Sequence, residues 1–297
     1  MTAARREAYS WGVAPELTVL VTGFVPFGGD AYNASGVTAR WLDGQSIEIG
    51  GPDGAVCASI VGKGDVPVLS ASQGAARSGA DAVLEAIDAC RPDVIVCLGQ
   101  GEAVAFRVEL EAHDSPDPPD PVVRDAVYHD ARIDRDPRAG YRATYASTLD
   151  AAGIVVAIAA AGGDARTSTD AGKFVCEDVL YHVLRHLEQR VATGAGADAP
   201  VAPCVAAGFI HVPRRVRVDT PVDGLLAADD PIRARPDFDG TGARAFTPND
   251  AGARPGERYV AQSLINTAIY RAIEAAVAGF ASVQRRAEGA GSGGALG

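Results

Sequence analysis

The chain has 297 residues, of which 47% are hydrophobic and 22% are charged, as in a globular protein with a sizeable core. Its longest apolar runs fall short of the ~18 residues that a membrane span needs. No signal-peptide core follows Arg5 and Arg6, so we expect a cytoplasmic protein without a membrane partner. The net charge of -11 argues against a nucleic-acid partner, because a phosphate backbone requires a cationic face.

The five cysteines are odd in number and contain no C-x-x-C pair, which excludes the common zinc and dithiol redox motifs. Four of them lie in or at the end of apolar runs, and we expect these to be buried, inert thiols: Cys57, Cys90, Cys97 and Cys204. The fifth, Cys176, lies near the start of a helical pattern and needs separate treatment.

The first half of the chain alternates apolar runs with helical patterns after an N-terminal extension of residues 1–16. The predicted elements, in chain order, are a strand at 17–24, a helix from residue 34, a strand at 56–63, a helix at 72–90 and a strand at 94–99. Between the first strand and the first helix lies a loop rich in Gly and Pro.

The same alternation returns in the second half of the chain. Its predicted elements are a strand at 153–160, a helix at 174–192, a strand at 203–213 and a closing helix at 257–285. Two polar stretches, 113–140 and 219–256, interrupt it and are expected to be irregular insertions. The Gly-rich tail, 286–297, has low complexity and is expected to be disordered.

Apolar strands that alternate with helices indicate a sheet buried on both faces. We therefore predict an α/β fold: a three-layer α/β/α sandwich with a mixed, mostly parallel central sheet. A single domain spanning 17–285 accommodates all of these elements.

Cys176 belongs to the segment TSTDAGKFVCEDVLYHVLRHL, whose apolar residues have the spacing of an amphipathic helix. This spacing places Cys176 in the first turn or two. The partial positive charge of a helix start favours a thiolate and would lower the pKa of the cysteine. The alternative is a small apolar side chain on the inner face of the helix.

His211 lies at the end of an apolar strand, which Pro213 stops almost at once. Because α/β sheets gather their sites at the carboxyl ends of strands, we expect this imidazole in a cleft beside Cys176. A Cys/His pair needs a third group to orient the imidazole. The candidates are Glu109 and Glu111.

The loop GFVPFGG at 23–29 lacks the Lys-Ser/Thr pair of a phosphate-binding loop. It carries two bulky side chains, Phe24 and Phe27, where a phosphate site would need bare backbone. The loop is therefore either an apolar pocket wall at the end of a strand or an ordinary packed connection.

Three blocks, LVTGFVPFGGDAYNAS, AGKFVCEDVLYHVL and AAGFIHVPR, resemble in order and spacing the signatures of the pyroglutamyl peptidase I family, over roughly residues 17–215. The resemblance implies a cysteine exopeptidase that hydrolyses the N-terminal pyroglutamyl residue from peptides through a thioester intermediate. It implies neither a metal nor an organic cofactor. It also implies a homo-oligomer, since members of the family often form tetramers.

By block position, the resemblance assigns Cys176 as nucleophile, His211 as general base and acid, and Glu109 as triad carboxylate. It also implies an apolar pocket for the pyrrolidone ring. The residues that match this pocket are Phe24, Phe27, Phe174 and Val175.

The sequence departs from the family around these positions. Glu177 and Asp178 follow Cys176 where the family usually has Asn, and two carboxylates directed inward would raise the pKa of the thiol. The Arg that usually follows the triad carboxylate is Leu110. A further family Arg, in a loop downstream, has no clean counterpart.

These departures leave alternatives open. In the first, the triad works and the substrate preference has shifted. In the second, the protein keeps the fold and pocket as a non-catalytic binding protein. A third alternative, a nucleoside phosphorylase or hydrolase on a similar scaffold, requires cationic phosphate ligands, of which the sequence offers few.

Overall fold

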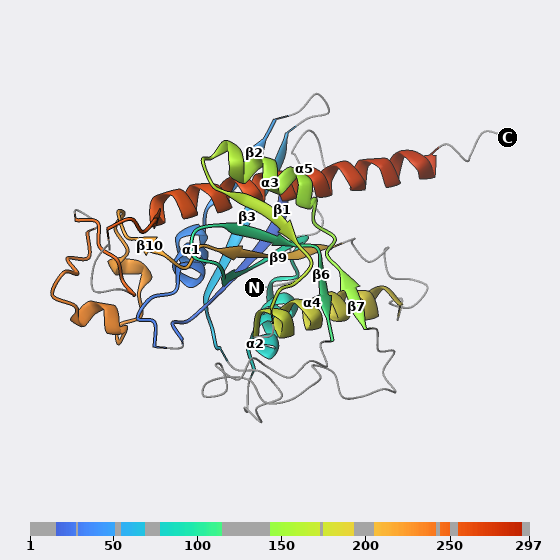
Figure 1. Ribbon diagram of the computed structural model, residues 1–297. Helices are drawn as coiled ribbons and strands as arrows, with labels where there is room; N and C mark the ends of the chain where they lie inside the picture. Colours follow the sequence, from blue (N-terminus) through green and yellow to red (C-terminus); the bar gives the residue numbers. More distant parts are fainter. Residues whose placement is uncertain are drawn as a thin grey trace.

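The computed structural model describes residues 16–27, 29–50, 55–68, 78–114, 143–172, 175–192, 205–241, 244–249 and 255–292. Its centre is a seven-stranded sheet (Figure 1). In spatial order the strands are β2 (Ser46–Ile49), β3 (Val56–Val66), β1 (Glu16–Phe24), β4 (Val94–Gln100), β9 (Ala206–Val212), β5 (Phe106–Glu109) and β8 (Ala165–Ser168). β2 runs antiparallel to β3, and β5 antiparallel to β9; the other neighbours are parallel. The predicted mixed, mostly parallel sheet is confirmed.

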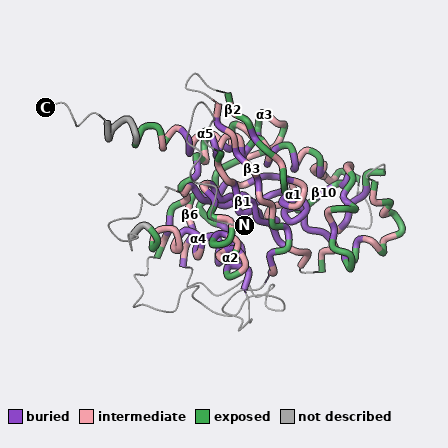
Figure 2. Tube along the Cα trace, turned by 180° about the vertical axis from the view of Figure 1, so that it is seen from behind, coloured by how far each residue is buried: buried purple, intermediate pink, exposed green. Residues whose placement is uncertain are grey.

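Helices cover both faces of this sheet and give the predicted three layers (Figure 1). One face shares a hydrophobic core with α1 (Ala34–Leu42), α3 (Ala151–Ala160) and α5 (Gln262–Ser292). The other shares a second core with α2 (Gly79–Cys90) and α4 (Val175–Ala192). Figure 2 shows these buried layers running through the middle of the molecule. The central strands are therefore buried on both sides, as their continuous apolar sequences require.

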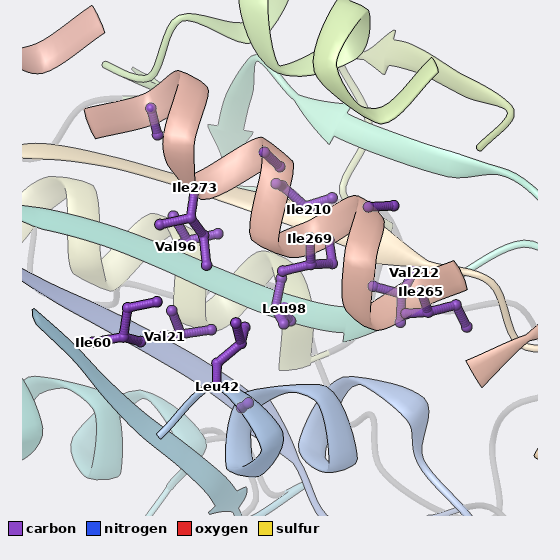
Figure 3. Packing of buried hydrophobic residues seen from close by; sticks show 14 of the residues in the cluster. Val21, Leu42, Ile60, Val96, Leu98, Ile210, Val212, Ile265, Ile269 and Ile273 are labelled. Atoms are coloured by element: carbon purple, nitrogen blue, oxygen red, sulfur yellow. The ribbon is translucent and has the colours of Figure 1, made fainter. Parts of the chain in front are cut away.

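The long helix α5 packs against the central strands of the sheet (Figure 3). Figure 3 shows three of its residues directed at the sheet, Ile265, Ile269 and Ile273. Their i, i+4 spacing places them on one face of the helix, and all three are fully buried. Burial of each such side chain contributes about 1.5–3 kcal/mol.

The carboxyl-terminal part of α5 extends beyond the sheet (Figure 1). Val283 is 58% exposed there. The helix runs to Ser292, so residues 286–292, which we expected in a disordered tail, are helical.

The prediction of a strand at 153–160 is wrong, because these residues form the helix α3. The side chain of Asp150 caps this helix by accepting the backbone N–H of Gly153 at 3.0 Å. Ile154 and Ile158, one turn apart, are its buried residues and belong to the core that α5 also lines. A short apolar run does not distinguish a buried strand from a buried helix by periodicity alone.

The remaining pairs of short strands lie outside the main sheet. They are β6 (Glu111–His113) with β7 (Thr144–Ala146), and β10 (Val216–Arg217) with β11 (Val260–Ala261). The described residues of the polar stretch 219–256 are irregular, as expected, and include two 3-10 helices, η3 (Asp223–Leu225) and η4 (Pro231–Ala234). It nevertheless adds Val222, Ile232 and Phe246 to the core. Nearly all of the other polar stretch, 113–140, lies outside the described residues.

Within the described ranges, no helix combines the length and the hydropathy needed to cross a membrane. Cys97 is buried as expected, whereas Cys57 and Cys90 are only partly buried. Cys57 faces the less buried side of β3, and Cys90 is the last residue of α2. Cys204 lies outside the described residues.

Candidate active site

Cys176 is the second residue of α4, which confirms its predicted place in the first helical turn. Its Sγ lies against Gly99, near the carboxyl end of β4. A Cβ added at Gly99 would lie 2.8 Å from this sulfur and 2.6 Å from a ring carbon of Phe209. Only glycine at this position lets the start of α4 approach the sheet so closely.

His211 lies on the strand next to this glycine. Gly99 of β4 and His211 of β9 are paired in the parallel register. Since neighbouring strands are ~4.8 Å apart, this pairing brings the imidazole and the thiol over adjacent strands. Gly101 makes room in the same way, because a Cβ there would lie 2.7 Å from Cβ of His211.

The carboxylate that contacts His211 is Glu109. Its Oε1 lies 2.7 Å from Nδ1 of His211, and the two side chains are 0% and 3% exposed. Nδ1–H therefore donates to the carboxylate and leaves Nε2 as the free ring nitrogen. Glu111 lies in β6, where its Oε1 is 3.5 Å from Nε2 of His113. Of the two candidates, the geometry favours Glu109.

The thiol of Cys176 is held in its protonated form. Burial raises its pKa to about 12, the charges of Glu109 and Glu177 add to this rise, and Arg107 opposes it. The expectation of a lowered pKa at the helix start is therefore wrong for the net pKa, although the backbone hydrogen bond of Cys176 does act in the lowering direction. A helix end contributes about 0.3–1 kcal/mol, less than one pKa unit, and burial outweighs it. The expected effect of a carboxylate beside the cysteine is confirmed for Glu177.

The imidazole of His211 is held in its neutral form. Burial lowers its pKa, and the hydrogen bond to Glu109 opposes this effect. The resting site thus pairs a thiol with a neutral imidazole, not a thiolate with an imidazolium.

Glu177 lies buried next to the thiol. Its Oε1 accepts the backbone N–H of His113, so it ties the start of α4 to β6. Burial raises the pKa of Glu177 to about 8, and this hydrogen bond only partly offsets the rise. At neutral pH the side chain is mostly the neutral acid.

Aromatic side chains line the same face of the sheet. Phe24 and Val175 are buried and Phe27 is partly buried, all in one cluster with Cys176. Sequence analysis missed a further member, Phe209, whose ring lies 4.9 Å from the His211 ring and 6.5 Å from that of Phe24, between centroids. Its spacing of two residues from His211 along a strand was the available signal. Phe174 lies outside the described residues.

The loop that carries Phe27 is tied to the ends of two central strands. Gln100 of β4 accepts the backbone N–H of Ala34 at 3.2 Å and donates to Asp30 at 3.0 Å. Arg214, just beyond β9, also donates to Asp30, from Nε at 2.9 Å and Nη2 at 3.1 Å. These contacts hold the loop over the strand ends that carry the candidate site.

Arg107 is the second residue that sequence analysis missed. It lies on β5 directly opposite His211 in the antiparallel register. Its neighbours in the site are Glu109, His211 and Glu102. Among the described residues, no group of three or more His, Cys, Asp or Glu side chains is arranged to hold a metal ion.

Comparison with known proteins supports a single family. A sequence model described as pyroglutamyl peptidase matches residues 17–219. A pyrrolidone-carboxylate peptidase of Chromobacterium violaceum is 33% identical over 200 residues, which are 66% of this chain and 77% of that protein. Another, from Streptococcus pyogenes, is 30% identical over 223 residues, or 73% of this chain and 88% of that protein.

Solved structures share the fold. The crystal structure of pyroglutamyl peptidase I from Bacillus amyloliquefaciens superposes with a TM-score of 0.56 at 24% identity, over 89% of this chain and 96% of that one. A mutant pyrrolidone carboxyl peptidase from Pyrococcus furiosus superposes with a TM-score of 0.55 at 25% identity, over 88% and 98% of the two chains.

Proposed function

This chain belongs to the pyroglutamyl peptidase family, and we propose that it hydrolyses the N-terminal pyroglutamyl residue from peptides with Cys176, His211 and Glu109 as a catalytic triad. One observation carries the assignment of the triad. Nδ1 of His211 lies 2.7 Å from Oε1 of Glu109, while Gly99, the register partner of His211, lies under Sγ of Cys176.

The resting protonation states determine how the reaction begins. Since the thiol and the imidazole are both neutral, Sγ of Cys176 attacks the pyroglutamyl carbonyl carbon as its proton passes to Nε2 of His211. Glu109 stabilises the imidazolium that forms at Nδ1. The backbone N–H groups in the first turn of α4 are suited to receive the negative charge on the carbonyl oxygen.

In the remaining steps the proton held by His211 passes to the leaving group, and a proton from water replaces it. The imidazolium gives its proton to the nitrogen of the leaving peptide as the C–N bond breaks, and a thioester remains on Cys176. Water then gives a proton to Nε2 of His211 and attacks the thioester carbon. The proton returns to the sulfur as free pyroglutamate departs.

The apolar side chains beside the thiol fit the acyl group. A pyrrolidone ring is flat and uncharged, so aromatic walls select it against the charged N-terminus of an ordinary peptide. We assign Phe24, Phe27 and Val175 to this pocket, and add Phe209, whose ring centroid lies 4.9 Å from that of His211 and 6.5 Å from that of Phe24. Phe174 remains a predicted member of the same pocket.

The direct test is hydrolysis of a pyroglutamyl-aminomethylcoumarin substrate, from about pH 6 to pH 9, by the wild type and by Cys176→Ala. We expect dye release by the wild type and none above background by the variant. A wild type that is inactive throughout this range, yet binds the substrate, would support the alternative of a binding protein.

A cytoplasmic location and assembly into homo-oligomers stay predictions. The free thiols of Cys57, Cys90, Cys97 and Cys176 suit a reducing compartment.

A further inference from the structure

Arg107 lies at the centre of the charged groups around His211. In the antiparallel register of β5 and β9, Arg107 is opposite His211, and Glu109 is opposite Phe209. Residues two apart on a strand share a face, so Arg107 and Glu109 approach the imidazole from the same side. Nη2 of Arg107 is 3.4 Å from Nδ1 of His211, and its Nε is 3.4 Å from Oε1 of Glu109.

The guanidinium of Arg107 does not form a hydrogen bond to Nδ1 of His211, and this contact does not stabilise an imidazolium. Nδ1 of His211 already donates its proton to Glu109 at 2.7 Å, so it has no lone pair for the guanidinium. The guanidinium of Arg107 and the neutral imidazole of His211 instead both face the carboxylate of Glu109. Arg107 therefore opposes a charge on His211 and keeps the ring neutral while substrate is absent.

The far end of Arg107 is held by a second carboxylate. Nη1 lies 3.6 Å from Oε1 of Glu102, and Arg166 also donates to Glu102. The side chain of Arg107 is only 19% exposed, whereas that of Arg166 is 54% exposed. Arg166 thus pairs with Glu102 near the surface, whereas Arg107 reaches inward to the imidazole.

The guanidinium of Arg107 is a positive charge among the acidic groups around the thiol of Cys176. Glu109 and Glu177 both disfavour a thiolate on Cys176, and Arg107 is the cation that favours it. Asp170 and Glu109 favour a charged His211, and Arg107 disfavours it. The buried Nε atom of Arg107 has no hydrogen-bond partner, although Oε1 of Glu109 lies 3.4 Å away and forms an ion pair with it.

We propose that Arg107 is a positioning residue of the triad, which holds Glu109 against His211 and supplies a positive charge beside the thiol of Cys176. This inference rests on the proposed function. Arg107 brings this cation from a strand, β5, whereas the family resemblance led us to expect an arginine from a downstream loop, nearly all of which lies outside the described residues.

The test compares three variants. Arg107→Met removes the charge at similar length, and Arg107→Lys keeps a charge without the planar fork. Arg166→Met is the control, because it removes a more exposed cation that also pairs with Glu102. The readouts are kcat and KM for pyroglutamyl-aminomethylcoumarin against pH, and the rate at which iodoacetamide alkylates Cys176, measured by peptide mass spectrometry. Thermal melting checks that each variant is folded.

We expect Arg107→Met to lower kcat about 10- to 100-fold at pH 7, because both the orientation of the base and the charge beside the thiol are lost. KM should change by less than about threefold, since the contacts of Arg107 are with Glu102, Glu109 and His211, none of which is assigned to the proposed pocket. Both limbs of the pH profile should move to higher pH, and alkylation at pH 7 should slow by about three- to tenfold. Arg107→Lys should restore most of the alkylation rate but less of kcat, and Arg166→Met should resemble the wild type.

The proposal is overturned if folded Arg107→Met keeps wild-type kcat and an unshifted pH profile, or if Arg166→Met causes an equal loss. Arg107→Gln replaces Arg107→Met, with the same expectations, if the latter does not fold. If the wild type does not hydrolyse the substrate, the proposed function fails. The alkylation rates then still decide on Arg107, because slower alkylation in the folded variant supports its role and an unchanged rate refutes it.

Discussion

Replacing Glu177 with glutamine removes one ionisation at the start of α4 and leaves the shape of the side chain nearly unchanged. The side chain is 2% exposed, and burial raises its pKa from 4.5 to about 8. The folded protein therefore favours the protonated acid more than the unfolded chain does. Stability gained from the protonated form is complete below about pH 4.5 and is lost as the pH rises towards 8.

The size of this effect follows from the shift. One pKa unit corresponds to 1.36 kcal/mol, so the wild type should lose roughly 3 kcal/mol of stability through this group between pH 5 and pH 8. The amide introduced by Glu177→Gln would not titrate, yet its oxygen can still accept the backbone N–H of His113. In a domain of this size the difference corresponds to about 6 °C in Tm.

Thermal melts at pH 5, 6, 7 and 8 measure the effect, with Glu48→Gln, an exposed carboxylate on β2, as the control. We expect the Tm of Glu177→Gln to exceed that of the wild type increasingly as the pH rises, and the Tm of the control to follow the wild type. Activity should also persist to higher pH in Glu177→Gln, because the wild type acquires a negative charge beside the thiol. Parallel curves of Tm against pH for Glu177→Gln and wild type would refute the reasoning.

Two further substitutions test the packing and the orientation of the site. Gly99→Ala should lower stability by about 1–3 kcal/mol and activity by more than tenfold, because its Cβ would displace the sulfur of Cys176, 2.8 Å away. Gly224→Ala, whose Cβ would meet no atom within 4 Å, should leave both within error, and equal effects would contradict the packing argument. Glu109→Gln should lower kcat about 10³-fold at nearly constant Tm, because an amide no longer favours the required imidazole tautomer. Glu111→Gln should change kcat by less than about twofold, and the reverse ranking would reassign the carboxylate.

The central strands β1, β4 and β9 could be predicted from sequence because each contains a continuous apolar run. β1, β3, β4 and β9 lie close to their predicted places. The edge strands β2 and β8 were not predicted, because both are short and neither sequence contains a continuous apolar run. Such strands form through pairing with a neighbour rather than through their own sequence.

The same distinction applies to the candidate site. Cys176 and His211 lie at the start of a helix and the end of a strand, and local patterns can locate such places. The role of Arg107 depends on the antiparallel register of β5 against β9, which joins residues 104 positions apart. The choice of Glu109 over Glu111 depends on the same register. The raised pKa of the thiol depends on burial by several elements, which the helix start alone does not reveal.

Trapping of the covalent intermediate tests the central claim most directly. The wild type, mixed rapidly with a pyroglutamyl peptide and quenched in acid, should carry one pyroglutamyl group as a thioester on the tryptic peptide that contains Cys176. Cys176→Ala should carry none, and Glu109→Gln should accumulate it more slowly. Cleavage of the peptide without an acylated Cys176, or equal cleavage by Cys176→Ala, would contradict the account.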